Sequence, residues 1–172
     1  VTESTTPAQE KQTNYIYVMN RYKDEDGNIH DGSDIYGDGS QNNPYRTIDK
    51  AFSLIPRDNG ADWVIGLYGV FYEHVELRGF RGDGAIRVYL MEQGNGEDSA
   101  VYGWVRISSC LQKFEFFGGV WIHDGTGHSR NETDDGHAIF HVIRSSTVWL
   151  EGMSLVTIGA SRYNVAVSQN SF

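Results

Sequence analysis

Residues 36–56 read YGDGSQNNPYRTIDKAFSLIP, a glycine turn followed by a short amphipathic segment between two prolines. An apolar stripe at the helical spacing i, i+3, i+4, i+7 is formed by Ile48, Ala51, Phe52 and Ile55. Thr47 is a suitable N-cap, and Pro56 cannot continue a helix. The stretch therefore predicts one helix at about 47–55.

The rest of the chain has the pattern of strands. A strand is expected at 15–19 and an irregular loop at 20–43, because that segment is rich in Asp, Gly, Asn and Ser. Further apolar runs lie at 63–67, 70–77, 86–91, 101–107, 114–122, 138–143 and 148–155. No second long helix is visible between the strands, which argues against a doubly wound α/β fold and favours an all-β fold.

Two segments echo each other. Residues 114–122 (FEFFGGVWI) and 148–156 (VWLEGMSLV) each read as two short strands that meet at a glycine corner. Repeats of this kind are typical of solenoids, in which each repeat buries its apolar face against the next. A β-sandwich is the alternative.

Composition excludes several classes of protein. The chain has 172 residues, enough for one domain with a core, and a formal net charge of −9, so a nucleic-acid partner is not expected. Its apolar runs are too short to cross a membrane, and its polar start predicts no signal peptide. Because the first residue is Val1, we expect the native N-terminus to lie upstream. Cys110 is the single cysteine, so no disulfide forms within the chain. We expect a linker or arm at 1–13, a strand, loop and capping helix at 14–62, and strand repeats at 63–172.

The opening of the chain resembles a known family. The matching positions are 15–18, Asp34, 37–40, 44–48, Ala51 and 55–56, followed by the segment 68–77. They are similar to the start of pectin-lyase-like right-handed parallel β-helix proteins, in the version found in phage tail fibres and tailspikes. The resemblance covers about 15–78, and this chain has Tyr68 where the family usually has Pro and Phe71 where it usually has Tyr.

The resemblance implies a right-handed parallel β-helix whose N-terminal end is closed by the helix at 47–55. It implies a virion tail protein, a structural and host-recognition module that binds cell-surface polysaccharide without cleaving it. Other tail or fibre proteins would be its partners, and a homotrimer is expected to cover the C-terminal end unless the chain is cut short there. The alternatives are a tailspike depolymerase (a polysaccharide lyase or glycoside hydrolase) and an adhesin outside the cell or on a bacterial surface.

Large aromatic side chains are expected to point outward on successive repeats. The predicted ligand-binding set is Tyr102, Trp104, Trp121 and Trp149, with Tyr89 one repeat earlier. Such rings can stack on sugars, bury against other subunits, or lie under local loops.

The sequence also contains candidate catalytic residues, but no motif selects among them. Glycosidic cleavage needs two carboxylates across the sugar, and the candidates are Glu73, Glu76, Glu115 and Glu151. The lyase branch of the family uses calcium-binding acids and an arginine base, for which the outward candidates are Arg87, Arg106 and Arg144. The alternative is a set of solvent-facing charges in an acidic chain.

A polar loop at 123–137 gathers potential metal ligands, namely His123, Asp124, His128, Asp134, Asp135 and His137. Their spacing matches no known metal motif, so a plain polar loop is the favoured interpretation and no cofactor is expected. Calcium is a weaker hypothesis here and at the Asp-Gly segment 31–39, which is first of all a turn signal.

Overall fold

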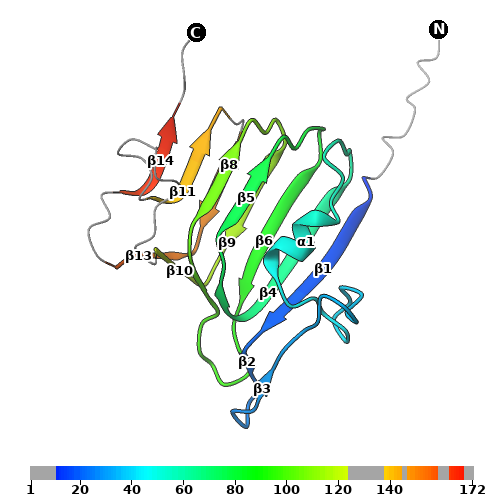
Figure 1. Cartoon of the computed structure of the whole chain (residues 1–172), viewed down its shortest axis with the longest axis vertical. Coiled ribbons are helices and arrows are strands. Elements are labelled where there is room, and N and C mark those ends of the chain that lie inside the picture. Colours follow the sequence, from blue (N-terminus) through cyan, green and yellow to red (C-terminus); the bar gives the residue numbers. More distant parts are fainter. Residues whose placement is uncertain (1–10, 124–137, 145–146, 159–162, 169–172) are drawn as a thin grey trace, which may run out of the picture.

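The computed structural model describes residues 11–123, 138–144, 147–158 and 163–168 (Figure 1). Strands dominate this part of the chain, and its one α-helix is α1 (Ile48–Ser53). No helix in these ranges is long and apolar enough to cross a membrane. The mainly β composition predicted from the sequence is therefore confirmed.

The strands follow one another in a repeating order. β1 (Thr13–Asn20) comes first, and the short β2 (Tyr22–Lys23) and β3 (Ile29–His30) form an antiparallel hairpin. After α1 come β4 (Asp62–Tyr72) and β5 (Val75–Arg78), and then three triplets. The triplets are β6 (Ala85–Met91), β7 (Ala100–Tyr102), β8 (Val105–Ser108); β9 (Lys113–Phe117), β10 (Val120–His123), β11 (Ala138–Ile143); and β12 (Val148–Glu151), β13 (Ser154–Thr157), β14 (Tyr163–Ser168).

Each triplet adds one strand to each of three parallel rows. The first row is β1-β4-β6-β9-β12, the second runs from the C-terminal half of β4 through β7, β10 and β13, and the third is β5-β8-β11-β14. The first two rows share β4, so they form one large parallel sheet that curls into a half-barrel (Figure 1).

The segment 20–43, predicted as an irregular loop, contains the β2–β3 hairpin and is therefore not wholly irregular.

The internal echo is confirmed as direct stacking. Phe114 pairs with Val148 across β9 and β12, and Val120 pairs with Ser154 across β10 and β13, with the same sequence offset. The corners between these strands have positive φ at Gly118 (71°), Gly119 (64°) and Gly152 (62°), where side chains are disfavoured.

The core fills the space between the rows, and alternate residues of β6, β7 and β8 are buried in it: Ile86, Val88, Leu90, Val101, Val105 and Ile107. The outward orientation predicted for Trp121 is wrong. Its side chain is 1% exposed and packs against Phe116 and Phe140 at ring-centroid distances of 5.7 and 5.1 Å. Phe114 and Phe116 point inward on β9, and strict alternation of inward and outward side chains would place Val120 inward on β10. The glycine corner between the two strands interrupts the alternation, so Trp121 points inward instead.

Helix α1 lies where its stripe predicted, and all four stripe residues are buried. The helix itself is shorter than 47–55, because Leu54 takes the C-cap position, where its N–H donates to the Ala51 carbonyl and the next N–H, of Ile55, donates to the Phe52 carbonyl. Phe52 packs edge-on against Phe80 at 6.4 Å, which places the helix against the β1 and β5 end of the strand rows (Figure 1).

Candidate functional site

Tyrosines gather on the outer surface of β1, β4 and β6. Ile65 and Leu67 of β4 are fully buried, so the alternating Gly66 and Tyr68 lie on the outer surface. We call the surface formed by Tyr15, Tyr17, Tyr22, Tyr68 and Tyr89 the tyrosine face. Strand pairing brings these rings together, because Tyr17 is in register with Gly66 and Gly66 with Tyr89.

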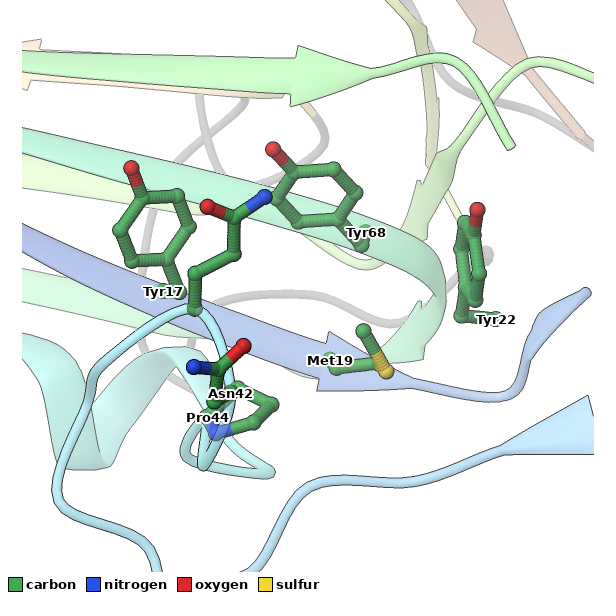
Figure 2. Close-up of a pocket in the computed structure, with 7 residues that line it drawn as sticks. Tyr17, Met19, Tyr22, Asn42, Pro44 and Tyr68 are labelled. Atoms are coloured by element: carbon green, nitrogen blue, oxygen red, sulfur yellow. The ribbon is translucent and has the colours of Figure 1, made fainter. Parts of the chain in front are cut away.

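Two adjoining cavities open on the tyrosine face. The first has a volume of about 250 Å³ and is lined by Tyr17, Met19, Tyr22, Gln41, Asn42, Pro44 and Tyr68 (Figure 2). The second has a volume of about 210 Å³ and is lined by Tyr15, Ile16, Tyr17, Val64, Gly66, Tyr68, Tyr89 and Met91. Tyr17 and Tyr68 belong to both, with ring centroids 6.3 Å apart. Removal from water and the neighbouring Tyr17 and Tyr22 raise the pKa of the Tyr68 hydroxyl, which therefore stays a neutral hydrogen-bonding group.

The loop ahead of α1 supplies one wall of the first cavity and is fixed by its own carboxylates. Asp38 accepts a hydrogen bond from the Ser40 N–H at 2.8 Å. Asp34 accepts from the N–H groups of Arg46 and Thr47 and from the Thr47 hydroxyl. Burial alone would raise the pKa of Asp34, but these bonds hold it below its ordinary value. Asp38 thus serves as a turn acceptor, the role that the Asp-Gly pattern favours, whereas Asp34 ties the loop to the start of α1.

Outer aromatic rings elsewhere stack on one another between successive strands. Tyr72 stacks on Tyr102 with centroids 4.8 Å apart and an interplanar angle of 15°. His74 stacks on Trp104 at 4.7 Å and 7°. Two of the predicted ligand residues, Tyr102 and Trp104, are therefore engaged with aromatic neighbours, and Trp104 is only 9% exposed.

The four predicted ligand residues do not form one site. Trp121 lies in the core, so its ring offers no face to a ligand. Trp149 on β12 is 53% exposed, and its indole N–H donates to Glu151 at 3.0 Å. Of the tyrosine face, Tyr89 was predicted to point outward, and the other four tyrosines were not predicted. The alternation of Tyr15 and Tyr17 with apolar residues in the predicted strand 15–19 was a usable signal for two of them.

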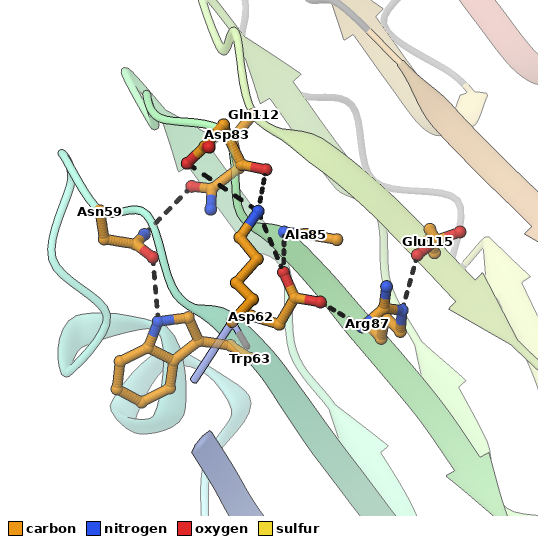
Figure 3. Close-up of polar contacts among 9 residues, drawn as sticks. Asn59, Asp62, Trp63, Asp83, Ala85, Arg87, Gln112 and Glu115 are labelled. Carbon is orange, nitrogen blue, oxygen red and sulfur yellow. Dashed lines mark hydrogen bonds and ion pairs between the residues drawn. The ribbon is translucent and has the colours of Figure 1, made fainter. Parts of the chain in front are cut away.

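Glu115, one of the four predicted catalytic acids, is held in a charged network across the strands (Figure 3). Arg87 donates through Nε to Glu115 at 2.8 Å and through a terminal nitrogen to Asp62 at 2.9 Å. Lys113 forms a second ion pair with Glu115 at 2.7 Å. Arg87, a predicted lyase base, is therefore bound by two carboxylates, and Glu115 by two cations.

The other predicted acids lie apart. Glu73, between β4 and β5, accepts from the N–H of Ile48 at 2.9 Å and of Asp49 at 3.4 Å, at the start of α1. Burial raises the pKa of Glu73 to about 7, against the effect of these two hydrogen bonds. Glu76 is exposed on β5, where it is in register with Arg106 of β8. Glu151 is exposed at the end of β12, and Arg144 is exposed after β11 with a positive φ of 47°.

Of the predicted metal ligands, the structure places His123, which lies at the end of β10 and is fully buried. The other five, Asp124, His128, Asp134, Asp135 and His137, lie outside the described residues. Within the described ranges no three His, Cys, Asp or Glu side chains gather into a group that could hold a metal ion. The metal hypothesis for the loop 123–137 therefore stays a prediction.

Comparison with known proteins finds no matching family model, no matching curated protein and no matching solved structure.

Proposed function

We propose that the chain is a host-recognition module of a phage tail or fibre, a right-handed parallel β-helix that binds cell-surface polysaccharide without cleaving it. The observation that carries this proposal is the pair of adjoining cavities on the tyrosine face. Tyrosine rings offer apolar faces to the C–H surfaces of sugars, and hydroxyl and amide groups offer hydrogen bonds to sugar hydroxyls. Tyr17, Tyr68, Gln41 and Asn42 provide this combination.

The β-helix part of the proposal is supported by the strand order. Parallel triplets stack in register, each adding one strand to each row, and a helix covers the first end. A stack of this kind buries the apolar side of each repeat against the next and leaves its outer surface for binding.

Binding without cleavage is supported by the contacts of the predicted acids. Glu115 lies between two cations, Glu73 accepts from the start of α1, and Glu151 accepts from Trp149. Each of these contacts directs the carboxylate toward a protein partner rather than toward the tyrosine face.

The proposed place is the virion tail, as a homotrimer in contact with other tail or fibre proteins. Apolar side chains at the β13 and β14 end support an assembly there, since Val156, Ile158, Val165 and Val167 are all more than 40% exposed. Light scattering tests this assembly, and a monomer at all concentrations would contradict it. An adhesin on a bacterial surface would use the same tyrosine face, so the virion location is tested by detecting the protein in purified particles.

The binding site is tested by calorimetric titration with host-wall or capsular polysaccharide. We expect Tyr17→Ala and Tyr68→Ala to weaken binding at least about tenfold, because each removes a ring shared by both cavities. Tyr72→Ala is the matched control, since Tyr72 lies on the same strand as Tyr68 and outside both cavities. Equal losses in all three variants, or no binding by the unaltered protein, would contradict the proposal.

A polysaccharide depolymerase is the second candidate, and one observation favours it. The pKa of Glu73, near 7, is in the range that a general acid needs at neutral pH. An assay for new reducing ends and unsaturated uronates tests this candidate. Product that disappears in Glu73→Gln would establish cleavage, and absence of product from the unaltered protein would exclude it for the polysaccharide tested.

A further inference from the structure

One row of outer residues on the tyrosine face has a gap. Tyr17, Gly66, Tyr89 and Phe117 are in register on β1, β4, β6 and β9. Three of these four positions carry an aromatic ring, and the glycine between the first and the second ring carries no side chain.

Among the described residues, the ring of Tyr89 is stacked on one side only. Its centroid lies 4.6 Å from that of Phe117 with an interplanar angle of 13°, so the two rings are nearly parallel. The opposite face of Tyr89 is turned toward the strand that carries Gly66. The cavity of about 210 Å³ lies there, bounded by Tyr17, Gly66 and Tyr89.

Gly66 keeps this gap open, and its backbone conformation does not require glycine, since Gly66 is not among the glycines with positive φ. A Cβ atom at this position would lie 3.2 Å from Tyr68 Cε2 and 3.5 Å from Tyr17 Cδ1. Even a methyl group would press on the Tyr68 ring, and a larger side chain would take up the space between the rings.

The width of the gap suits one ring. Tyr17 and Tyr89 are two strands apart, which corresponds to about 9.5 Å between their Cα atoms. Phe117 stacks on Tyr89 at 4.6 Å across one strand spacing, so a guest ring on the Gly66 side has room for a similar contact. A pyranose ring can present its C–H groups to an aromatic face in this way, which makes it the guest expected from the proposed polysaccharide ligand.

The lining favours an uncharged sugar. Among the described residues, neither cavity is lined by a charged side chain. Arg87, the cation two positions before Tyr89 on β6, is already bound by Asp62 and Glu115. The net charge of −9 also repels polyanions.

We infer that the gap at Gly66 is a subsite for one pyranose ring of a neutral glycan, and that the adjoining cavity beside Gln41 and Asn42 holds the neighbouring sugar unit. This inference rests on the proposed polysaccharide binding and adds the class of sugar and the position of its ring. The ligand supplies the ring that is missing from the row, and the amides of the loop bind its hydroxyl groups.

The experiment is a glycan array that carries neutral and uronate- or sialate-bearing glycans, followed by titration of the best binder against three variants. Gly66→Val fills the gap with a residue that suits a strand, and Tyr89→Ala removes one of its walls. Tyr72→Ala is the control outside both cavities. Circular dichroism and thermal unfolding verify that each variant is folded; if Gly66→Val is not, Tyr89→Ala and the array decide.

We expect binding to neutral glycans, a loss of at least about tenfold in Gly66→Val and Tyr89→Ala, and little change in Tyr72→Ala. Binding to acidic glycans alone, or neutral binding that survives both substitutions, would overturn this inference and leave polysaccharide binding standing. Failure to bind any glycan would overturn the proposed function as well.

Discussion

At the β1 end of the strand rows, inward-facing Ile16 and Val18 are 5% and 0% exposed, whereas at the β14 end inward-facing Val165 and Val167 are 41% and 70% exposed. All four are β-branched aliphatic residues, and each pair occupies alternate positions of its strand. The difference lies in what covers them, because α1 lies against the first end and no described element lies beyond β14.

One inward column shows the change along the rows. Leu77, Ile107, Val142 and Val167 are in register on β5, β8, β11 and β14, and they are 1%, 0%, 7% and 70% exposed. Burial of a strand residue therefore needs a neighbour on both sides, and α1 supplies that neighbour at the first end. An apolar strand pattern therefore predicts the direction in which a side chain points, but not whether that side chain is buried.

The largest expected effect is at the covered end. Phe52→Ala should lower the free energy of unfolding by about 3–5 kcal/mol, because the ring is 4% exposed and packs on Phe80. Urea unfolding followed by fluorescence measures this loss. A loss below about 1 kcal/mol would show that the helix does not cover the core, and the comparison of the two ends would fail.

A matched pair of valines tests the column directly. Val142→Ala should cost about 2 kcal/mol of unfolding free energy, because the side chain is 7% exposed, whereas Val167→Ala should cost less than about 0.5 kcal/mol. Equal losses from the two substitutions would show that β14 is covered. A Val167→Ala loss that grows with protein concentration would identify another copy of the chain as the cover.

The N-cap of α1 gives a smaller effect at the same covered end. Thr47 accepts a hydrogen bond from the Lys50 N–H at 3.2 Å and donates to Asp34 at 2.7 Å. Thr47→Ala should cost about 1 kcal/mol in urea unfolding. Ser53→Ala, at the exposed end of the same helix, is the control, and an equal cost there would remove the special role of the N-cap.

A pH dependence of stability is expected from Glu73 at the same covered end. The pKa of Glu73 is about 7 in the folded protein against an ordinary value of 4.5, so between these values the folded state binds more protons than the unfolded state. The contribution of Glu73 to stability should therefore fall as pH rises from 4.5 through 7. Unfolding measured across this range should show a fall that Glu73→Gln removes and Glu76→Gln, at an exposed position, retains. An unchanged slope in Glu73→Gln would contradict the assignment.

Much of the fold was predictable from local pattern. The helix stripe and the Thr47 N-cap depend on neighbours in sequence, and both are confirmed. The orientation of Trp121 was not predictable in this way, because two glycines reset the alternation ahead of it. The arrangement of the tyrosine face could not be predicted from local pattern either, because Tyr17, Gly66 and Tyr89 are far apart in sequence and meet only through strand pairing.

The sequence by itself determined the element types, the helix that begins after Thr47 and the glycine corners. These follow from periodicity and backbone preference, which act over a few residues. The tertiary structure alone decided which rings share a surface, which acids are bound by Arg87, and that Gly66 leaves a gap between two tyrosines. Register between distant strands sets all three, and no local pattern of residues encodes it.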